Sequence, residues 1–301
     1  NLSDPAIALP TDHFNTVLYT GDGAADHDIT GVGFQPDFTW IKMRSSTGQH
    51  MLFDVIRGAG EYLVSNNTDE EKTDATSLLS FDSDGISVGS GYHVNSNTAT
   101  FANWNWKAAS SNSDGTETVS LSANPTAGFS IIAYTGTGTT DGSDTVGHGL
   151  SQAPELYFVK ARTEASHDWN AYAEPIGVAN YVALNLTNAS AAQSNGVNHD
   201  EAPTSSVITL GSWNAVNESS KNFIIYAFHS VEGYSKVGSF VGNGSTDGPF
   251  IYTGLSPAYL LIKRTDAAFQ WYVWDDKRDE INPNNKVLYP SLSDAEDDSA
   301  D

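Results

Sequence analysis

Residues 98–106 read TATFANWNW, and residues 38–44 read FTWIKMR; in both runs small, polar or charged side chains interleave with apolar ones. Alternation with a period of two is typical of a β-strand, because successive side chains point to opposite faces of a sheet. Similar runs are separated by clusters of Gly, Asn, Asp and Ser, with Asp-Gly turn signals at 84–85, 141–142 and 247–248. No stretch of ten or more residues carries a convincing helical apolar stripe. The sequence therefore predicts an all-β protein built from short antiparallel strands.

The chain repeats itself. The string YTGDG at residues 19–23 returns as YTGTG at 134–138 and, more loosely, as FVGNG at 240–244. Each copy is followed by a Gly, then a Pro, and then a strand that ends in a basic residue. Three ordered landmarks in three copies predict three related units. The basic residues that end these strands are Lys42, Lys160 and Lys263.

The repeat sets the expected organisation of the chain. A unit of about 100 residues made of antiparallel strands fits a two-layer sandwich, because each sheet has one apolar face to bury. The third unit has no counterpart of the closing strands, and we expect it to pack on the second unit, on another copy or on further chain. The predicted segments are an N-terminal arm (1–13), repeat 1 (14–108), an exposed linker or edge segment (109–128), repeat 2 (129–233) and an incomplete repeat 3 (234–301).

Composition narrows the classes of function. The 301 residues include 37 acidic and 14 basic side chains, for a net charge of −23, which disfavours binding to nucleic acid. The chain has no cysteine, so disulfides and thiolate chemistry are absent. No apolar run approaches the roughly 20 residues of a membrane helix, and we expect no membrane insertion.

Several strings carry a resemblance to a known family. They are YSKVGSFVGNG at 234–244, DGPF at 247–250, IKRTD at 262–266, GHGL at 147–150, APTSSV at 202–207 and WNWKA at 104–108. Together they resemble a repeat module of predicted tail-fibre and other virion structural proteins of tailed bacteriophages, particularly marine ones. The resemblance implies a concanavalin-like or jelly-roll sandwich and a place on the virion. It implies no catalytic or binding residues.

Motifs that often carry chemistry have structural explanations here. Residues 85–89, GISVG, match the G-x-S-x-G pattern of a nucleophile elbow, but the equivalent stretch ITLG at 208–211 lacks the serine, so we interpret the segment as a strand. The acids of residues 82–85 and 141–144 are explained as turn formers, with one calcium ion as the alternative. We expect no other cofactor and no catalytic residue.

Two recurring features are candidates for recognition. Loops 89–95 and 211–217 align with one gap, which places Tyr92 opposite Trp213 and sets Asn95 and Asn217 in the same loops. A ring beside an amide can stack on a sugar and bond its hydroxyls, or it can close the open end of a sandwich. The second feature is the basic strand, interpreted as a fold determinant that pairs with carboxylates rather than as a ligand site. Its residues are Lys42, Arg44, Lys160, Arg162, Lys263 and Arg264.

These observations favour a non-enzymatic virion structural protein, a tail-fibre or surface-appendage module that takes part in host attachment. The expected location is the virion surface, and the expected partners are other virion proteins, further copies of the chain (three in a fibre) and a host-surface glycan. A capsid decoration protein is the nearest alternative. A polysaccharide depolymerase, which would need two carboxylates about 5–10 Å apart, and a secreted carbohydrate-binding protein are the others.

Overall fold

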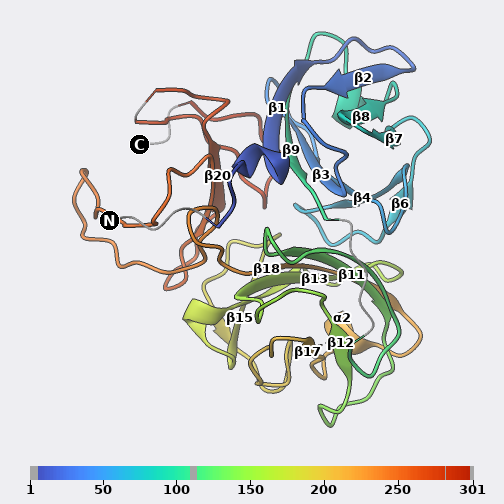
Figure 1. Ribbon diagram of the computed structural model, residues 1–301, viewed down its shortest axis with the longest axis vertical. Coiled ribbons are helices and arrows are strands. Elements are labelled where there is room, and N and C mark those ends of the chain that lie inside the picture. Colours follow the sequence, from blue (N-terminus) through green and yellow to red (C-terminus); the bar gives the residue numbers. More distant parts are fainter. Residues whose placement is uncertain (1–5, 109–113, 282, 299–301) are drawn as a thin grey trace.

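The computed structural model describes residues 6–108, 114–281 and 283–298, and it confirms the all-β prediction (Figure 1). A first sandwich combines a large antiparallel sheet, in the order β1-β9-β3-β4-β5-β6, with a smaller sheet, β2-β8-β7. Its strands are β1 (Phe14–Thr20), β2 (His27–Thr30), β3 (Phe38–Met43), β4 (His50–Asp54), β5 (Glu61–Val64), β6 (Lys72–Thr73), β7 (Leu78–Asp82), β8 (Gly85–Val88) and β9 (Thr100–Trp106).

The second sandwich has a large sheet in the order β10-β11-β18-β13-β14-β15-β16 and a small sheet of β12 and β17. Apart from β10, the order of its large sheet matches that of the first sandwich, position for position. Its strands are β10 (Val119–Asn124), β11 (Phe129–Thr135), β12 (Thr145–Gly147), β13 (Leu156–Ala161), β14 (Asn170–Ala173), β15 (Asn180–Ala183), β16 (Ala191–Ala192), β17 (Val207–Thr209) and β18 (Asn222–Phe228).

Strand register shows which residues are equivalent. Trp104 of β9 pairs with Trp40 of β3, and Tyr226 of β18 pairs with Phe158 of β13. Two positions along, Lys42 and Lys160 lie opposite Ala102 and Ile224. Trp104 and Tyr226 are therefore at the same place in their sandwiches, and so are the two lysines.

Residues 119–124 lie in the stretch predicted to be an exposed linker or an edge segment. They form β10, which pairs along its whole length with β11 at the edge of the second large sheet. The polar composition of this stretch suits an edge strand, since one face of such a strand meets solvent. Residues 109–113 of the expected linker lie outside the described residues.

Helices are short. They are the 3₁₀ helices η1 (Pro10–Asp12) and η2 (Glu174–Ile176) and the one-turn helices α1 (Tyr92–Asn95) and α2 (Asn214–Asn217). Within the described residues, no helix has the length and apolarity needed to cross a membrane.

The third unit contains a two-stranded sheet, β19 (Tyr259–Lys263) and β20 (Trp271–Asp275). Isolated bridges join Val273 to Leu288 and Val287 to Asp297, which extends the pattern in the way that β5 and β6 extend the first sandwich. By this register β19 and β20 correspond to β3 and β4. Residues 236–258 are all described and form no strand.

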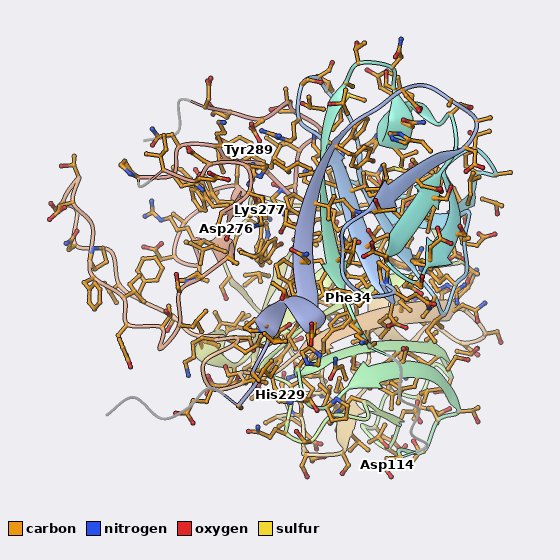
Figure 2. The ribbon with its side chains drawn as sticks, turned by 45° about the horizontal axis from the view of Figure 1, so that its top comes forward. Phe34, Asp114, His229, Asp276, Lys277 and Tyr289 are labelled. Carbon is orange, nitrogen blue, oxygen red and sulfur yellow. The ribbon has the colours of Figure 1, made fainter. Side chains whose placement is uncertain are left out.

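One hydrophobic core joins the three units. In Figure 2, where Tyr289 and Lys277 mark the third unit and His229 the second, side chains occupy the space between the large sheets. Each complete sandwich also has its own core between its large and small sheets. Central strands of the large sheets therefore bury both faces, which explains why β3 is buried throughout. The shared core includes Phe38, Trp40, Trp104, Trp106, Phe129, Phe158, Trp169, Tyr226, Trp271, Val273 and Leu288.

Candidate functional site

Asn95 ends helix α1, and its amide fastens the loop that follows β1. Its Oδ1 accepts a hydrogen bond from the backbone N–H of Asp22 at 2.9 Å, and its Nδ2 donates to Asp22 Oδ1 at 3.0 Å and to the Ala24 carbonyl at 3.1 Å. The side chain is fully buried. Asn95 therefore holds the fold together with the same atoms that a ligand would need.

Asn217 does the same in the second sandwich. Its Oδ1 accepts from the Thr137 N–H at 2.9 Å, while its Nδ2 donates to Asp144 Oδ2 at 2.9 Å and to the Thr139 carbonyl at 3.1 Å. The pairing of Asn95 with Asn217 expected from the loop alignment thus describes two equivalent loop anchors.

The two rings of the candidate site are not equivalent. The backbone N–H groups of Val216 and Asn217 donate to the Trp213 carbonyl, whereas in the first sandwich the carbonyl in this position belongs to Gly91. Tyr92 is therefore one residue out of step with Trp213, which corrects the alignment: a one-residue gap can be placed in more than one way when only the sequence is known. Tyr92 is 54 % exposed. Trp213 is half-buried, and its ring meets Tyr181 edge-on at 4.8 Å between centroids.

Substitution of the two rings should separate their roles. We expect Tyr92→Ala to change the free energy of unfolding by no more than about 0.5 kcal/mol, since the ring is exposed. Trp213→Ala should cost roughly 2 kcal/mol, because it removes the contact with Tyr181. Urea unfolding measures both changes, and a glycan-array titration of the same variants tests recognition. A large loss of stability in Tyr92→Ala would contradict the assignment of this ring to the surface.

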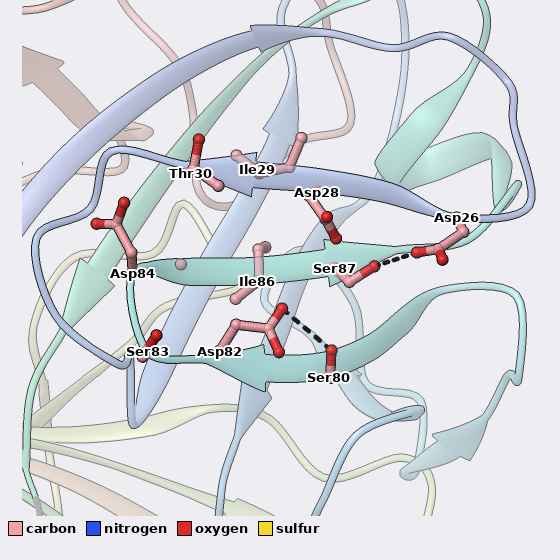
Figure 3. Close-up of a pocket in the computed structure, with 11 residues that line it drawn as sticks. Asp26, Asp28, Ile29, Thr30, Ser80, Asp82, Ser83, Asp84, Ile86 and Ser87 are labelled. Atoms are coloured by element: carbon pink, nitrogen blue, oxygen red, sulfur yellow. Dashed lines mark hydrogen bonds between the residues drawn. The ribbon is translucent and has the colours of Figure 1, made fainter.

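Acidic residues line a shallow depression of about 360 Å³ over β2, β7 and β8 (Figure 3). Ser87 donates its hydroxyl to Asp26 at 2.6 Å, and Ser80 donates to Asp82 at 3.1 Å. Asp84 accepts the backbone N–H groups of Gly31 at 3.2 Å and Gly33 at 2.7 Å, so it ties two loops together. Ser87 lies within strand β8, as the interpretation of GISVG as a strand requires.

Calcium binding at residues 82–85 or 141–144 would require their acidic side chains to point toward a common ion. Asp141 accepts from the N–H and hydroxyl of Ser143, and Asp144 accepts from Asn217, so the acids of the second turn serve different bonds. Among the described residues, no three His, Asp or Glu side chains gather as metal ligands. Calcium binding at these turns stays a prediction.

The lysines of the three basic strands lie at the contacts between units. Each of the three lysines points from the inner face of its own sheet to a backbone carbonyl of the neighbouring unit: Lys42 to Asp294 at 2.7 Å, Lys160 to Thr68 at 3.2 Å and Lys263 to Thr187 at 3.1 Å. The first unit thus contacts the third, the second contacts the first, and the third contacts the second. The three units form a closed ring.

Ion pairs strengthen two of the three contacts in the ring. Arg44 makes a bidentate pair with Glu296 at 2.8 Å, and Arg162 makes one with Glu71. At the third contact the equivalent residues are Thr265 and Ser190, joined by a backbone hydrogen bond of 2.8 Å. Arg264, which the sequence grouped with this set, instead pairs with Asp266 at the surface. The interpretation of the strand as a fold determinant therefore applies to the contacts between units, and the lysines bond carbonyls rather than carboxylates.

A second charged pair supports the same two contacts. Asp54 and Arg57 are buried in the first unit with Nε to Oδ2 at 2.5 Å, and Asp275 and Arg278 repeat the pair in the third unit at 2.6 Å. A neighbouring aromatic residue completes each pair: Tyr226 donates its hydroxyl to Asp54 at 2.7 Å, and Trp104 donates Nε1 to Asp275 at 2.9 Å. The shared D-x-x-R spacing at 54–57 and 275–278 is the feature of the sequence from which these two pairs could be predicted. The second unit has Ala173 and Ile176 at these positions.

Burial changes the acid–base behaviour of the lysines. Burial lowers the pKa of Lys42 to about 8, against the opposing effect of Asp294 and Glu296. Burial likewise lowers the pKa of Lys160 to about 8, and nearby acids, Asp168 first among them, oppose it. Because these pKa values are lower in the folded state than in the unfolded state, folding releases protons between pH 8 and about 10.5.

The free energy of unfolding should therefore rise with pH in this window. From pH 7 to 9.5 we expect each of the two lysines to add about 2 kcal/mol, because the cost of burying its charge disappears as it loses its proton. Above pH 10 the trend should reverse, since buried tyrosines such as Tyr134 and Tyr226 have pKa values raised by burial and ionise more easily in the unfolded chain. Urea unfolding across this pH range measures the effect. An equal slope in the Lys42→Met/Lys160→Met variant would show that other groups cause it.

Comparison with known proteins shows the family to which the chain belongs. Residues 9–301 match the family model described as a domain of unknown function, DUF7483. No curated protein and no solved structure matches the chain.

Proposed function

We propose that this chain, which belongs to the DUF7483 family, is a non-enzymatic structural protein of a virion surface, most directly a module of a tail fibre or similar appendage that contacts the host. The observation that supports this proposal best is the ring of units around one shared core. Neighbouring units are joined by backbone hydrogen bonds, by the ion pairs Arg44–Glu296 and Arg162–Glu71, and by hydrogen bonds from the aromatic residues Trp104 and Tyr226. A rigid assembly of this kind suits a virion component that has to withstand mechanical force.

The resemblance of the repeat strings to phage virion modules gives the proposal its biological setting. The net charge of −23 is consistent with a protein present in many copies, since mutual repulsion keeps such a surface soluble. Tyr92, exposed at one end of the first sandwich, is the candidate contact for a host glycan. A capsid decoration protein is the alternative that shares this architecture.

Localisation on particles tests the proposal. Density-purified virions of a tailed phage that encodes this chain should contain it in mass-spectrometric analysis, and gold-labelled antibodies should mark the tail or its appendages. Label over the capsid would favour the decoration protein instead. Absence from purified particles, together with release of sugars when the protein is incubated with host polysaccharide, would overturn the proposal in favour of a depolymerase.

A further inference from the structure

The third unit has an open sheet edge. In the complete sandwiches, β3 lies between β4 and β9, and β13 lies between β14 and β18. Strand β19, which occupies the same position, pairs with β20 alone among the described residues. All of β3 is buried, whereas no residue of β19 is, and Leu260 is 40 % exposed. An edge of this kind presents a row of backbone donors and acceptors that can pair with another strand.

The equivalence of the three units places an apolar surface of the second unit beside this edge. This surface, called the shelf below, consists of Leu156, Ala173 and Ile176. Tyr226 covers the Asp54–Arg57 pair of the first unit, and Trp104 covers the corresponding pair of the third. These four charged residues are at most 8 % exposed. The equivalent place in the second unit is formed by Leu156, Ala173 and Ile176, and all three remain partly exposed. The ring thus has three equivalent places, of which two are filled by an aromatic residue from a β9-type strand.

A third observation points the same way. The string FVGNG at 240–244 corresponds to YTGDG at 19–23, whose first residues belong to β1 and pair with β9. In the third unit this stretch pairs with no strand in the described part of the chain, and Phe240 and Val241 are 48 % and 87 % exposed. A strand placed beside β19 would offer its other edge to this stretch, as β9 does to β1.

We propose that the edge of β19 binds an antiparallel β-strand donated by a partner polypeptide, and that the central side chain of this strand lies on the shelf of Leu156, Ala173 and Ile176. The register of β9 on β3 and of β18 on β13 defines the partner. Its inward side chains are an aromatic residue opposite Tyr259, a large residue opposite Leu261 and a small or aliphatic residue opposite Lys263. The central residue is apolar and needs no hydrogen-bond donor, because Ala173 and Ile176 replace the Asp and Arg found at the two filled places. Affinity comes from the backbone ladder and specificity from the alternate side chains.

A synthetic strand tests this assignment on the intact chain. The probe is a peptide with the pattern of residues 222–228, with Phe in place of Tyr226 and flanking lysines for solubility. The matched control has the same composition with inward and outward residues exchanged. A second control carries N-methyl groups on the amides that face β19, so that the ladder cannot form while the side chains are kept. Hydrogen exchange at residues 259–263 and 239–242 reports binding without any change to the protein.

We expect the native-pattern peptide to slow exchange at both segments at least tenfold, and neither control peptide to do so. Ile176→Asp should weaken binding at least tenfold, whereas Ile281→Asp, at a site 74 % exposed, should leave it unchanged. Absence of protection, or equal protection by the exchanged peptide, would overturn the proposal. Protection of 259–263 in the absence of peptide would overturn it too. Protection that grows with protein concentration would show that a second copy occupies the edge, and protection independent of concentration would show that the same chain does.

Discussion

Replacing Asp54 with alanine is expected to lower the free energy of unfolding by about 3–5 kcal/mol. The carboxylate accepts the Nε–H of Arg57 and the hydroxyl of Tyr226, and it also accepts the backbone N–H groups of Ile56 and Arg57. Both charged side chains are fully buried. The substitution therefore leaves a guanidinium out of water without its main counter-charge. Urea unfolding at pH 7 measures the loss.

The chain offers a matched control for this variant. The second unit carries Ala173 and Ile176 where the first has Asp54 and Arg57, so the same framework accommodates both solutions. The double variant Asp54→Ala/Arg57→Ile should recover at least half of the loss, because no unpaired charge remains buried. A double variant as unstable as Asp54→Ala alone would contradict the assignment of the loss to an uncompensated charge.

Replacing Trp104 with alanine is expected to cost about 3–5 kcal/mol. The indole is fully buried in the shared core, where it meets Trp40 and Tyr259 edge-on at 5.9 and 5.8 Å between ring centroids. Its Nε1 also donates to Asp275 of the third unit at 2.9 Å. The cavity would open between the first and third units, so the third unit should lose protection first. Urea unfolding combined with hydrogen exchange at residues 259–275 detects both effects.

Trp104→Phe separates packing from hydrogen bonding. An aromatic ring is retained and the Nε1–H is lost, so we expect a loss of about 1–3 kcal/mol, the contribution of one hydrogen bond to a buried carboxylate that still accepts from Arg278. If the third unit keeps its protection in Trp104→Ala while the first sandwich loses stability, the indole serves its own sandwich more than the contact between units.

The fold class followed from the sequence because strand formation is largely local. The alternation in 98–106 specifies a pleated strand, and the Asp-Gly turn at 84–85 marks the reversal between β7 and β8. The Gly-rich strings at 19–23 and 134–138 located equivalent strands, since β1 pairs with β9 and β11 pairs with the corresponding strand β18. For residues 119–124 the sequence left a linker and a sheet edge as alternatives, because an edge strand with a solvated face has the composition of a loop; the structure shows the edge strand.

The candidate site was less accessible to sequence reasoning. The loops of Asn95 and Asn217 predict that the two residues are equivalent, but only the tertiary structure shows that both amides are buried and bind the backbone N–H groups of Asp22 and Thr137. Tyr92 and Trp213 were paired with a one-residue error, since the alignment of two short loops has no unique gap. The sequence of a loop does not show whether its aromatic side chains are exposed to solvent or packed against other residues.

By itself, the sequence determined that this protein is made of antiparallel strands, where the repeated first strands of the first two units lie, and that a basic residue lies near the end of one strand in each unit, because these properties depend on neighbours along the chain. Only the tertiary structure decided that the three units close into a ring, that Lys42 reaches a carbonyl of residue 294 and that Tyr226 meets Asp54. Those contacts join residues separated by 252 and 172 positions, and they arise because the large sheets bury their second face against each other. The alternation of side chains along a strand shows that the strand has two faces. It does not show whether the second face meets solvent or another sheet, because that depends on how the sheets pack.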